Sequence, residues 1–346
     1  MTSPVRDIYL VGTIPMTRPY DVFTLVADTV GDRIARVPDG EIGDRRQWIL
    51  GQYALLATAK GMEVSDYPKE GMVRHFGYNI PVRPKAGATV DDIDFGELGY
   101  ARYAIAHYAL FRALKEIGRI PKHWRFQVNL PMPMDVMLMV EPAARAVVER
   151  AYERSMVADL RRIQDAIPHD ELAITWDEVH GVLVWEDPNN QYVRFWFPDK
   201  QGGALDRYVR FGNMVAPGVE LGFHLCYGSQ NNKHAMEPKD LSACVNLTNA
   251  VTERLARKLD YVQMPVPHDR RDDAYYAPLA NLRRERVGQV YLGLVHYEDG
   301  VPGIKQRIAT AERFLPNFGI STECGFGRMP SDHDIRRLLE MHRQAV

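Results

Sequence analysis

The chain has 346 residues, of which 46% are hydrophobic, and this is enough for one large domain or two ordinary ones. Its 43 basic and 45 acidic residues nearly balance without any block of like charge, which argues against nucleic acid or a membrane surface as a partner. Three cysteines are too few for a disulfide framework, and no apolar run approaches the ~20 residues that span a bilayer or forms the core of a signal peptide. We therefore expect a cytoplasmic globular protein.

Short apolar segments bounded by turn residues recur along the chain and predict β-strands. They are too continuously apolar to alternate between a buried and an exposed face, which is typical of parallel strands covered on both sides. In chain order, the eight predicted strands cover residues 8–14, 33–40, 125–131, 172–178, 219–226, 261–267, 289–296 and 319–325.

Helical patterns lie between most of these strands. In the last of them, Ser331 suits the N-cap position, with Asp334 three residues later in a variant of the capping box. Alternation of strands and helices, repeated eight times, predicts an α/β fold of the (β/α)₈ TIM barrel type that forms a single domain over residues 1–346. The five predicted helices cover residues 97–117, 142–166, 238–258, 302–314 and 331–345.

Two insertions interrupt this rhythm. Residues 62–96 follow the second predicted strand and are rich in Gly, Pro and Asp, and residues 181–203 follow the fourth as an aromatic loop. Because loops after barrel strands build the active-site face, each insertion is either a lid or specificity loop, or a decoration. The aromatic side chains indicate a flat or apolar part of a substrate, a packing surface or a homodimer contact; they are Trp185, Tyr192, Phe195, Trp196 and Phe197.

Three residues at predicted strand ends form a candidate metal site. His224 and Cys226 are two positions apart on one strand, so their side chains point to the same face. Cys324 ends the eighth predicted strand, and all strands of a barrel open their carboxyl ends onto one face. One imidazole and two thiolates suit zinc, with a fourth position left open. The alternative is that all three are ordinary core residues, as we expect for Cys244 within a predicted helix.

Sulfur-rich ligation makes zinc a better holder of thiolates than activator of water. A thiol placed in the open position is deprotonated by the charge of the metal, and it remains a nucleophile toward an alkyl carbon. The three residues therefore predict alkyl transfer to a thiol, with the zinc-bound thiolate as nucleophile.

The chain resembles the C-terminal catalytic barrel of cobalamin-independent methionine synthase, within the superfamily that also contains uroporphyrinogen decarboxylase. The similarity extends over essentially the whole chain at low identity, and the paired zinc motifs are its most specific part. The segments that carry it are LVGTIP (10–15), DGEIGDRRQWI (39–49), ITWDE (174–178), HLCYGS (224–229), DGVPGIKQRIATAERF (299–314) and STECGFGR (321–328).

The resemblance implies transfer of a methyl group to the zinc-bound sulfur of a homocysteine-like acceptor, with His224, Cys226 and Cys324 as ligands. It also implies that Glu41 contacts the amino-acid substrate and that Asp177 holds the ammonium group of that substrate. Glu178 of the same acidic motif is a further substrate-binding residue. The alternative for Glu41 and Asp177 is an ion pair with Arg45 or Arg46. His296 corresponds, after a one-residue shift, to the histidine that assists the leaving group; a core histidine is the alternative.

The chain also departs from the family pattern. The family has a zinc-binding glutamate at the end of the sixth strand, where this chain has no carboxylate near Pro265, so His268, Glu323 or water is left for the fourth position. The full-length enzyme has a second, N-terminal barrel that these 346 residues do not contain. The donor is therefore open among a folate, a methylated corrinoid protein or another alkyl donor, and similar single-barrel proteins open epoxides with a zinc-bound thiol.

Two further hypotheses remain. One is a metal-free lyase of the uroporphyrinogen decarboxylase type, although such an enzyme has no need of the His-x-Cys pair and the second cysteine. The other is a non-catalytic relative that binds zinc or a small molecule, which the missing carboxylate supports. The fold alone cannot choose among these hypotheses, because function depends on the site.

Overall fold

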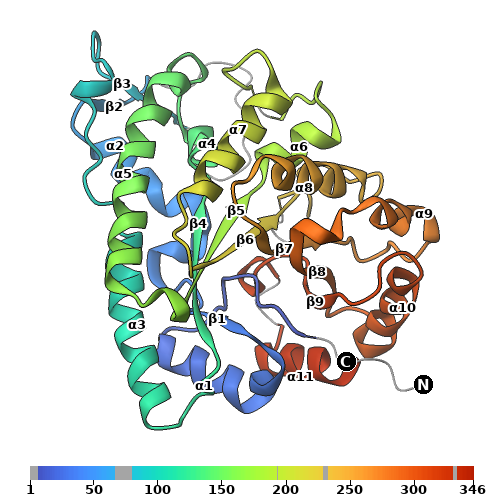
Figure 1. The fold of residues 1–346 in the computed structure, drawn as a ribbon. Coiled ribbons are helices and arrows are strands. Elements are labelled where there is room, and N and C mark those ends of the chain that lie inside the picture. Colours follow the sequence, from blue (N-terminus) through green and yellow to red (C-terminus); the bar gives the residue numbers. More distant parts are fainter. Residues whose placement is uncertain (1–6, 67–79, 193, 229–232, 330–332) are drawn as a thin grey trace.

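The computed structural model of the chain describes residues 7–66, 80–192, 194–228, 233–329 and 333–346. Within these residues, seven strands form one curled sheet in the order β1-β4-β5-β6-β7-β8-β9, and every neighbouring pair is parallel (Figure 1). They correspond to seven of the eight predicted strands. Their bounds are β1 (Arg36–Pro38), β4 (Arg125–Pro131), β5 (Leu172–Glu178), β6 (Glu220–Leu225), β7 (Leu259–Pro265), β8 (Val287–Val295) and β9 (Gly319–Thr322).

The strands are covered on both faces, as their continuous apolar sequences predict. In β5, six of the seven residues are buried, and only Asp177 near its carboxyl end is partly exposed. A parallel sheet with both faces covered leaves its strand ends as the places where polar side chains reach a cavity. The carboxyl ends of β5, β6 and β9 therefore decide where the functional residues lie.

Residues 8–14, the first predicted strand, complete the edge of the sheet without forming a regular strand. Ile8 makes a single parallel bridge with Ile320 of β9. The Val11 carbonyl accepts a hydrogen bond from the side-chain amide of Gln127 at 3.2 Å rather than from the backbone of a neighbouring strand. The α/β fold with a curled parallel sheet is thus confirmed, whereas closure as eight strands stays a prediction.

Helices surround the sheet on its outer side (Figure 1). All five predicted helices are present with shifted ends, and α1 and α7 are long helices that the sequence patterns did not single out. No helix in the described part of the chain is both long and apolar enough to cross a membrane. The long helices are α1 (Pro19–Val30), α3 (Tyr100–Glu116), α5 (Arg145–Ala166), α7 (Lys200–Asn213), α8 (Ser242–Arg254), α10 (Gly300–Glu312) and α11 (Ile335–Ala345).

The predicted start of the last helix was wrong. Helix α11 begins at Ile335, and Asp334 is its N-cap rather than its third residue. The Asp334 carboxylate accepts hydrogen bonds from the backbone N–H groups of Arg336 at 2.8 Å and Arg337 at 3.2 Å, which satisfies two of the unpaired amides of the first turn. Ser331 lies outside the described residues.

The two insertions differ in structure. The first contains an antiparallel hairpin of β2 (Met62–Val64) and β3 (Val82–Pro84), while residues 67–79 lie outside the described part. The second is not a loop throughout, because it overlaps α6 (His180–Glu186) and the start of α7. Further short helices are α2 (Tyr53–Thr58), α4 (Pro133–Val136) and α9 (Asp273–Tyr276).

Aromatic side chains of the second insertion pack between helices. The Trp196 indole N–H donates to the Glu149 carboxylate of α5 at 2.8 Å, and the Arg207 guanidinium of α7 lies 4.1 Å from the centre of the Phe197 ring. These contacts support a packing role for Trp196 and Phe197. Tyr192, by contrast, reaches the cavity described below.

Candidate metal centre and active-site cavity

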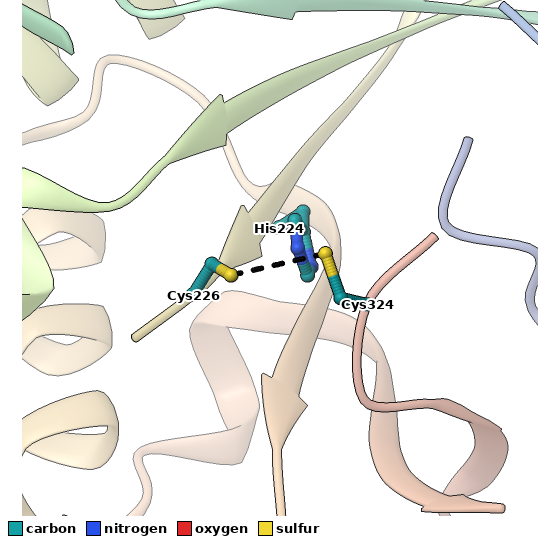
Figure 2. A group of neighbouring side chains, drawn as sticks. All are labelled: His224, Cys226 and Cys324. Carbon is teal, nitrogen blue, oxygen red and sulfur yellow. Dashed lines mark hydrogen bonds between the residues drawn. The ribbon is translucent and has the colours of Figure 1, made fainter. Parts of the chain in front are cut away.

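His224, Cys226 and Cys324 come together at the carboxyl ends of their strands, as the sequence predicts. His224 lies in β6, Cys226 follows that strand directly, and Cys324 follows β9 by two residues. One ligand atom from each residue lies within 4.8 Å of the other two, and the two sulfur atoms are 3.9 Å apart (Figure 2). His224 and Cys226 are buried, and Cys324 is partly exposed.

The protonation and hydrogen bonding of this cluster fit a metal ion. Nε2 of His224 is buried and has no hydrogen-bond partner among the described residues, whereas Nδ1 contacts the side-chain oxygen of Gln263. A hydrogen bond from Cys226 holds the pKa of the Cys324 thiol well below its ordinary value despite burial, and His224 lowers it further. A thiolate beside an imidazole nitrogen that lacks a partner is a set of ligands that zinc binds well.

The same charges act on the histidine. Burial by itself lowers the pKa of His224, but the neighbouring Asp177 carboxylate and the Cys324 thiolate raise it to about 9. The Asp177 carboxylate lies 3.8 Å from Nε2 of His224. Without a metal, a proton on the imidazole supplies the positive charge that this group of anions requires, and a divalent cation at the same place supplies more of it.

Neither residue proposed as fourth ligand belongs to the cluster. Glu323 pairs instead with His234, with 2.7 Å between Oε1 and Nε2. His268 is directed toward Asp299 at 3.5 Å, and 43% of its side chain is exposed. Among the described residues, the group that could hold a metal therefore consists of three residues, and a tetrahedral ion held by them would keep one coordination position open.

A cavity of about 210 Å³ opens beside the cluster. Its lining combines apolar side chains with carboxylates, cationic groups and the two cysteines of the cluster, which is the composition of a small-molecule site. The residues that matter for its chemistry are Thr13, Glu41, Asn129, Asp177, His180, Tyr192, Cys226, His234, Cys324 and Arg328. Leu183 and Tyr192 come from the second insertion, so part of that insertion does reach the cavity.

Glu41 lies on a turn directly after β1. Its φ of 49° falls in the left-handed region that residues other than glycine rarely adopt, and such strain is common at functional sites. Its backbone N–H donates to the Asp39 carboxylate at 2.9 Å, and its own carboxylate accepts a hydrogen bond from the Thr13 hydroxyl. Arg45 pairs with Asp39 at 2.7 Å rather than with Glu41, which leaves the Glu41 carboxylate directed toward the cavity.

Asp177, at the end of β5, is the second carboxylate in the cavity wall. Burial raises its pKa well above the ordinary value, and the anionic Cys324 and Glu41 add to this effect against the influence of His224. Burial likewise raises the pKa of Glu41. Two buried carboxyl groups with raised pKa values favour a cationic group between them, because a nearby positive charge lowers both pKa values and stabilises the ionised carboxylates.

Glu178 points away from the cavity and is fully buried. Its carboxylate accepts hydrogen bonds from the backbone N–H groups of Gly181 and Val182 and from the Tyr208 hydroxyl. The Asp135 carboxylate accepts hydrogen bonds from the two preceding backbone N–H groups, those of residues 179 and 180. The two acidic side chains therefore hold the first turn of α6, and through it the wall of the cavity.

The buried pair of Glu178 and Asp135 predicts a pH dependence of stability. Burial raises the pKa of each carboxyl to about 8, and the charge of Asp135 adds to the rise at Glu178. The folded state then binds more protons than the unfolded chain from about pH 4 to 8, so the free energy of unfolding falls as the pH rises through this range. Glu178→Gln removes one of the two titrating carboxyls, and we expect it to lose about 3–4 kcal/mol less stability between about pH 5 and 8. Urea denaturation at fixed ionic strength measures the difference.

The control for this experiment is Glu340→Gln, which changes an exposed residue of α11. It should leave the dependence of stability on pH as it is in the unchanged protein. Equal slopes for Glu178→Gln and the unchanged protein would contradict the assignment of raised pKa values to this pair.

His234 lines the cavity, whereas His296, the histidine that the resemblance implies, does not. His296 is buried and is not among the residues that line the cavity; its Nε2 contacts the Val266 carbonyl at 2.8 Å, and burial lowers its pKa. His234, which sequence patterns did not single out, does line the cavity. Despite burial, its carboxylate partners Glu323 and Glu237 raise its pKa to about 9. Its place in the connection after a ligand-bearing strand was the signal that could have found it.

Comparison with known proteins shows the fold. No family model matches the chain, and no curated protein matches it in sequence. Among solved structures, a B12-independent methionine synthase from Shewanella sp. W3-18-1, in complex with selenomethionine, is similar with a TM-score of 0.59 and 12% identity over 99% of this chain and 96% of that one.

Two further structures agree. A putative vitamin-B12 independent methionine synthase from Listeria monocytogenes has a TM-score of 0.51 and 12% identity over 94% of this chain and 84% of that one. A methyltransferase from Methanosarcina mazei has a TM-score of 0.50 and 10% identity over 99% and 94%. The resemblance noted in the sequence is therefore confirmed for the fold, at identities too low to transfer a substrate.

Proposed function

We propose that the protein is a zinc-dependent transferase that moves a methyl or other alkyl group to the sulfur of a small, homocysteine-like thiol. The observation that carries this proposal is the cluster of His224, Cys226 and Cys324, whose two cysteines line a cavity that two largely buried carboxylates also line. The names of the solved structures with this fold, which are methionine synthases and a methyltransferase, support methyl transfer as the class of reaction.

The three ligands would hold zinc through Nε2 of the histidine and the two thiolates. When bound, zinc would lower the pKa of the acceptor thiol so that the sulfur is present as a thiolate at neutral pH. In the transfer, a sulfur–carbon bond forms as the bond between the alkyl carbon and the donor breaks, and the leaving group takes the electron pair. The thiol proton is released to solvent.

Glu41 and Asp177 would bind the ammonium group of the acceptor. Both carboxylates line the cavity, and burial raises the pKa of each of them. An ammonium group between them would form charge-assisted hydrogen bonds and direct the thiol toward the cysteines. Glu178 and His296 do not line the cavity, and we leave them out of the proposed substrate contacts.

The wider assignments belong to the same proposal. The chain would form one barrel domain, closed by residues 8–14, and its partners would be a small thiol and a small alkyl donor in the cytoplasm. The candidate donors are a folate, a methylated corrinoid protein and another alkyl donor such as an epoxide.

Product formation tests the proposal. The zinc-loaded protein is incubated with homocysteine and, in turn, methyltetrahydrofolate, methylcobalamin or a small epoxide, and the thioether is measured by mass spectrometry. We expect a thioether with at least one donor, at a rate proportional to zinc content. A zinc-loaded protein that forms no thioether would favour the non-catalytic zinc-binding alternative, and a folded protein that takes up no zinc would favour the metal-free lyase.

A further inference from the structure

A fully buried amide side chain connects the two segments that carry the candidate zinc ligands. Gln263 lies in β7 and is paired in register with His224 of the neighbouring strand β6. Its side chain contacts Nδ1 of His224 on one side. On the other side it donates hydrogen bonds to the backbone around Cys324.

The orientation of the Gln263 amide is determined by its surroundings. Its nitrogen lies 3.2 Å from the carbonyl oxygens of Thr322 and Glu323, which can only accept hydrogen bonds, and 3.2 Å from the Ser321 hydroxyl. The nitrogen must therefore be the donor on this side, which turns the side-chain oxygen toward His224. That oxygen can only accept, so it requires a proton on Nδ1 of the imidazole.

This arrangement decides which nitrogen of His224 faces the metal position. A proton on Nδ1 leaves the lone pair of Nε2 for coordination, and Nε2 is the buried atom that has no hydrogen-bond partner among the described residues. Gly293 of β8 makes room for the amide, because a Cβ at this position would lie 3.2 Å from the Gln263 nitrogen and 2.8 Å from the Cα of Glu323.

We propose that Gln263 is the positioning residue of the metal centre: it selects the Nδ1-protonated form of His224 and holds the β9 exit, with Cys324, at the distance that zinc requires. This inference rests on the proposed zinc site and adds the residue that preorganises it. Partners that orient a ligating histidine in this way typically contribute ten- to a hundredfold to metal affinity.

Zinc affinity of three variants tests the proposal. Gln263→Leu removes both sets of hydrogen bonds, and we expect zinc to bind about ten- to a hundredfold more weakly in competition with a chromophoric chelator. Gln263→Glu can still accept from Nδ1 but cannot donate to the two carbonyls, so its affinity should lie between those of Gln263→Leu and the unchanged protein.

The matched control is Gln127→Leu. Gln127 is also a buried strand glutamine whose amide donates to backbone carbonyls, but it contacts none of the three ligands. It should lose stability and yet change zinc affinity by less than about threefold. An equal loss in Gln127→Leu, or an unchanged affinity in a folded Gln263→Leu, would overturn the proposal.

A second measurement does not depend on either leucine variant. Nitrogen NMR of the zinc-loaded, unchanged protein should show His224 with its proton on Nδ1 and its metal on Nε2, and the opposite arrangement would overturn the proposal. If the unchanged protein binds no zinc, the proposed function fails. In the metal-free protein, the ring nitrogens measured at a pH above the pKa of His224, where the imidazole is neutral, then still show whether its proton lies on Nδ1, so the two failures can be told apart.

Discussion

Replacing Cys226 or Cys324 with serine is expected to remove zinc from the protein and abolish alkyl transfer. The unchanged protein, purified under reducing conditions, should contain about one zinc per chain, because the three ligand atoms lie within 4.8 Å of one another. Structural zinc sites bind the metal with a free energy of about 10–16 kcal/mol, to which four ligands contribute. The loss of one thiolate should therefore weaken zinc binding by about 100- to 1000-fold. Elemental analysis and chelator competition measure the two quantities.

The control for this experiment is Cys244→Ser. Cys244 is equally buried, but it lies on α8, and its thiol contacts the Tyr227 hydroxyl at 3.7 Å rather than the ligand cluster. It should retain the full zinc content. Zinc retained by Cys226→Ser or Cys324→Ser would show that the ligand assignment is wrong, and zinc lost from Cys244→Ser as well would point to unfolding.

Replacing Asp177 with asparagine is expected to raise the KM for the thiol acceptor with a smaller change in kcat. The substitution removes a negative charge from the cavity wall while it preserves the shape of the side chain. A hydrogen bond between charged groups contributes about 1.5–3 kcal/mol, which corresponds to a rise in KM of about 10- to 150-fold. Initial rates over a range of acceptor concentrations, with zinc content measured on the same samples, separate binding from chemistry.

Zinc content also separates two roles for Asp177. Its carboxylate lies 3.8 Å from Nε2 of His224, so a loss of zinc in Asp177→Asn would identify Asp177 as a metal ligand rather than an acceptor-binding residue. Asp187→Asn is the control, because this residue follows α6 in the same connection but does not line the cavity. An unchanged KM in a zinc-loaded Asp177→Asn protein would contradict the ammonium-binding role.

The structure also separates the residues of the acidic motif, which sequence patterns treat alike. Asp177 and Glu178 are neighbours at the end of a strand, and alternation along the strand sends their side chains to opposite faces. Asp177 reaches the cavity, whereas Glu178 turns outward and binds the first amides of α6. A motif match assigns a role to a segment, and only the direction of each side chain shows which residue can contact a substrate.

What the sequence by itself determined was the seven parallel strands of the sheet, five of the long helices between them and the candidate ligands. Strands buried on both faces require continuous apolar runs, and a spacing of two residues places His224 and Cys226 on one face, so both features are local and visible in the chain. Only the tertiary structure decided the rest. It brings Cys324 to a pair 98 positions away, places Gln263 against His224 and His234 in the cavity wall, and keeps His296 out of the cavity. These depend on which side chains meet across the sheet, and no local pattern encodes contacts between residues so distant in the sequence.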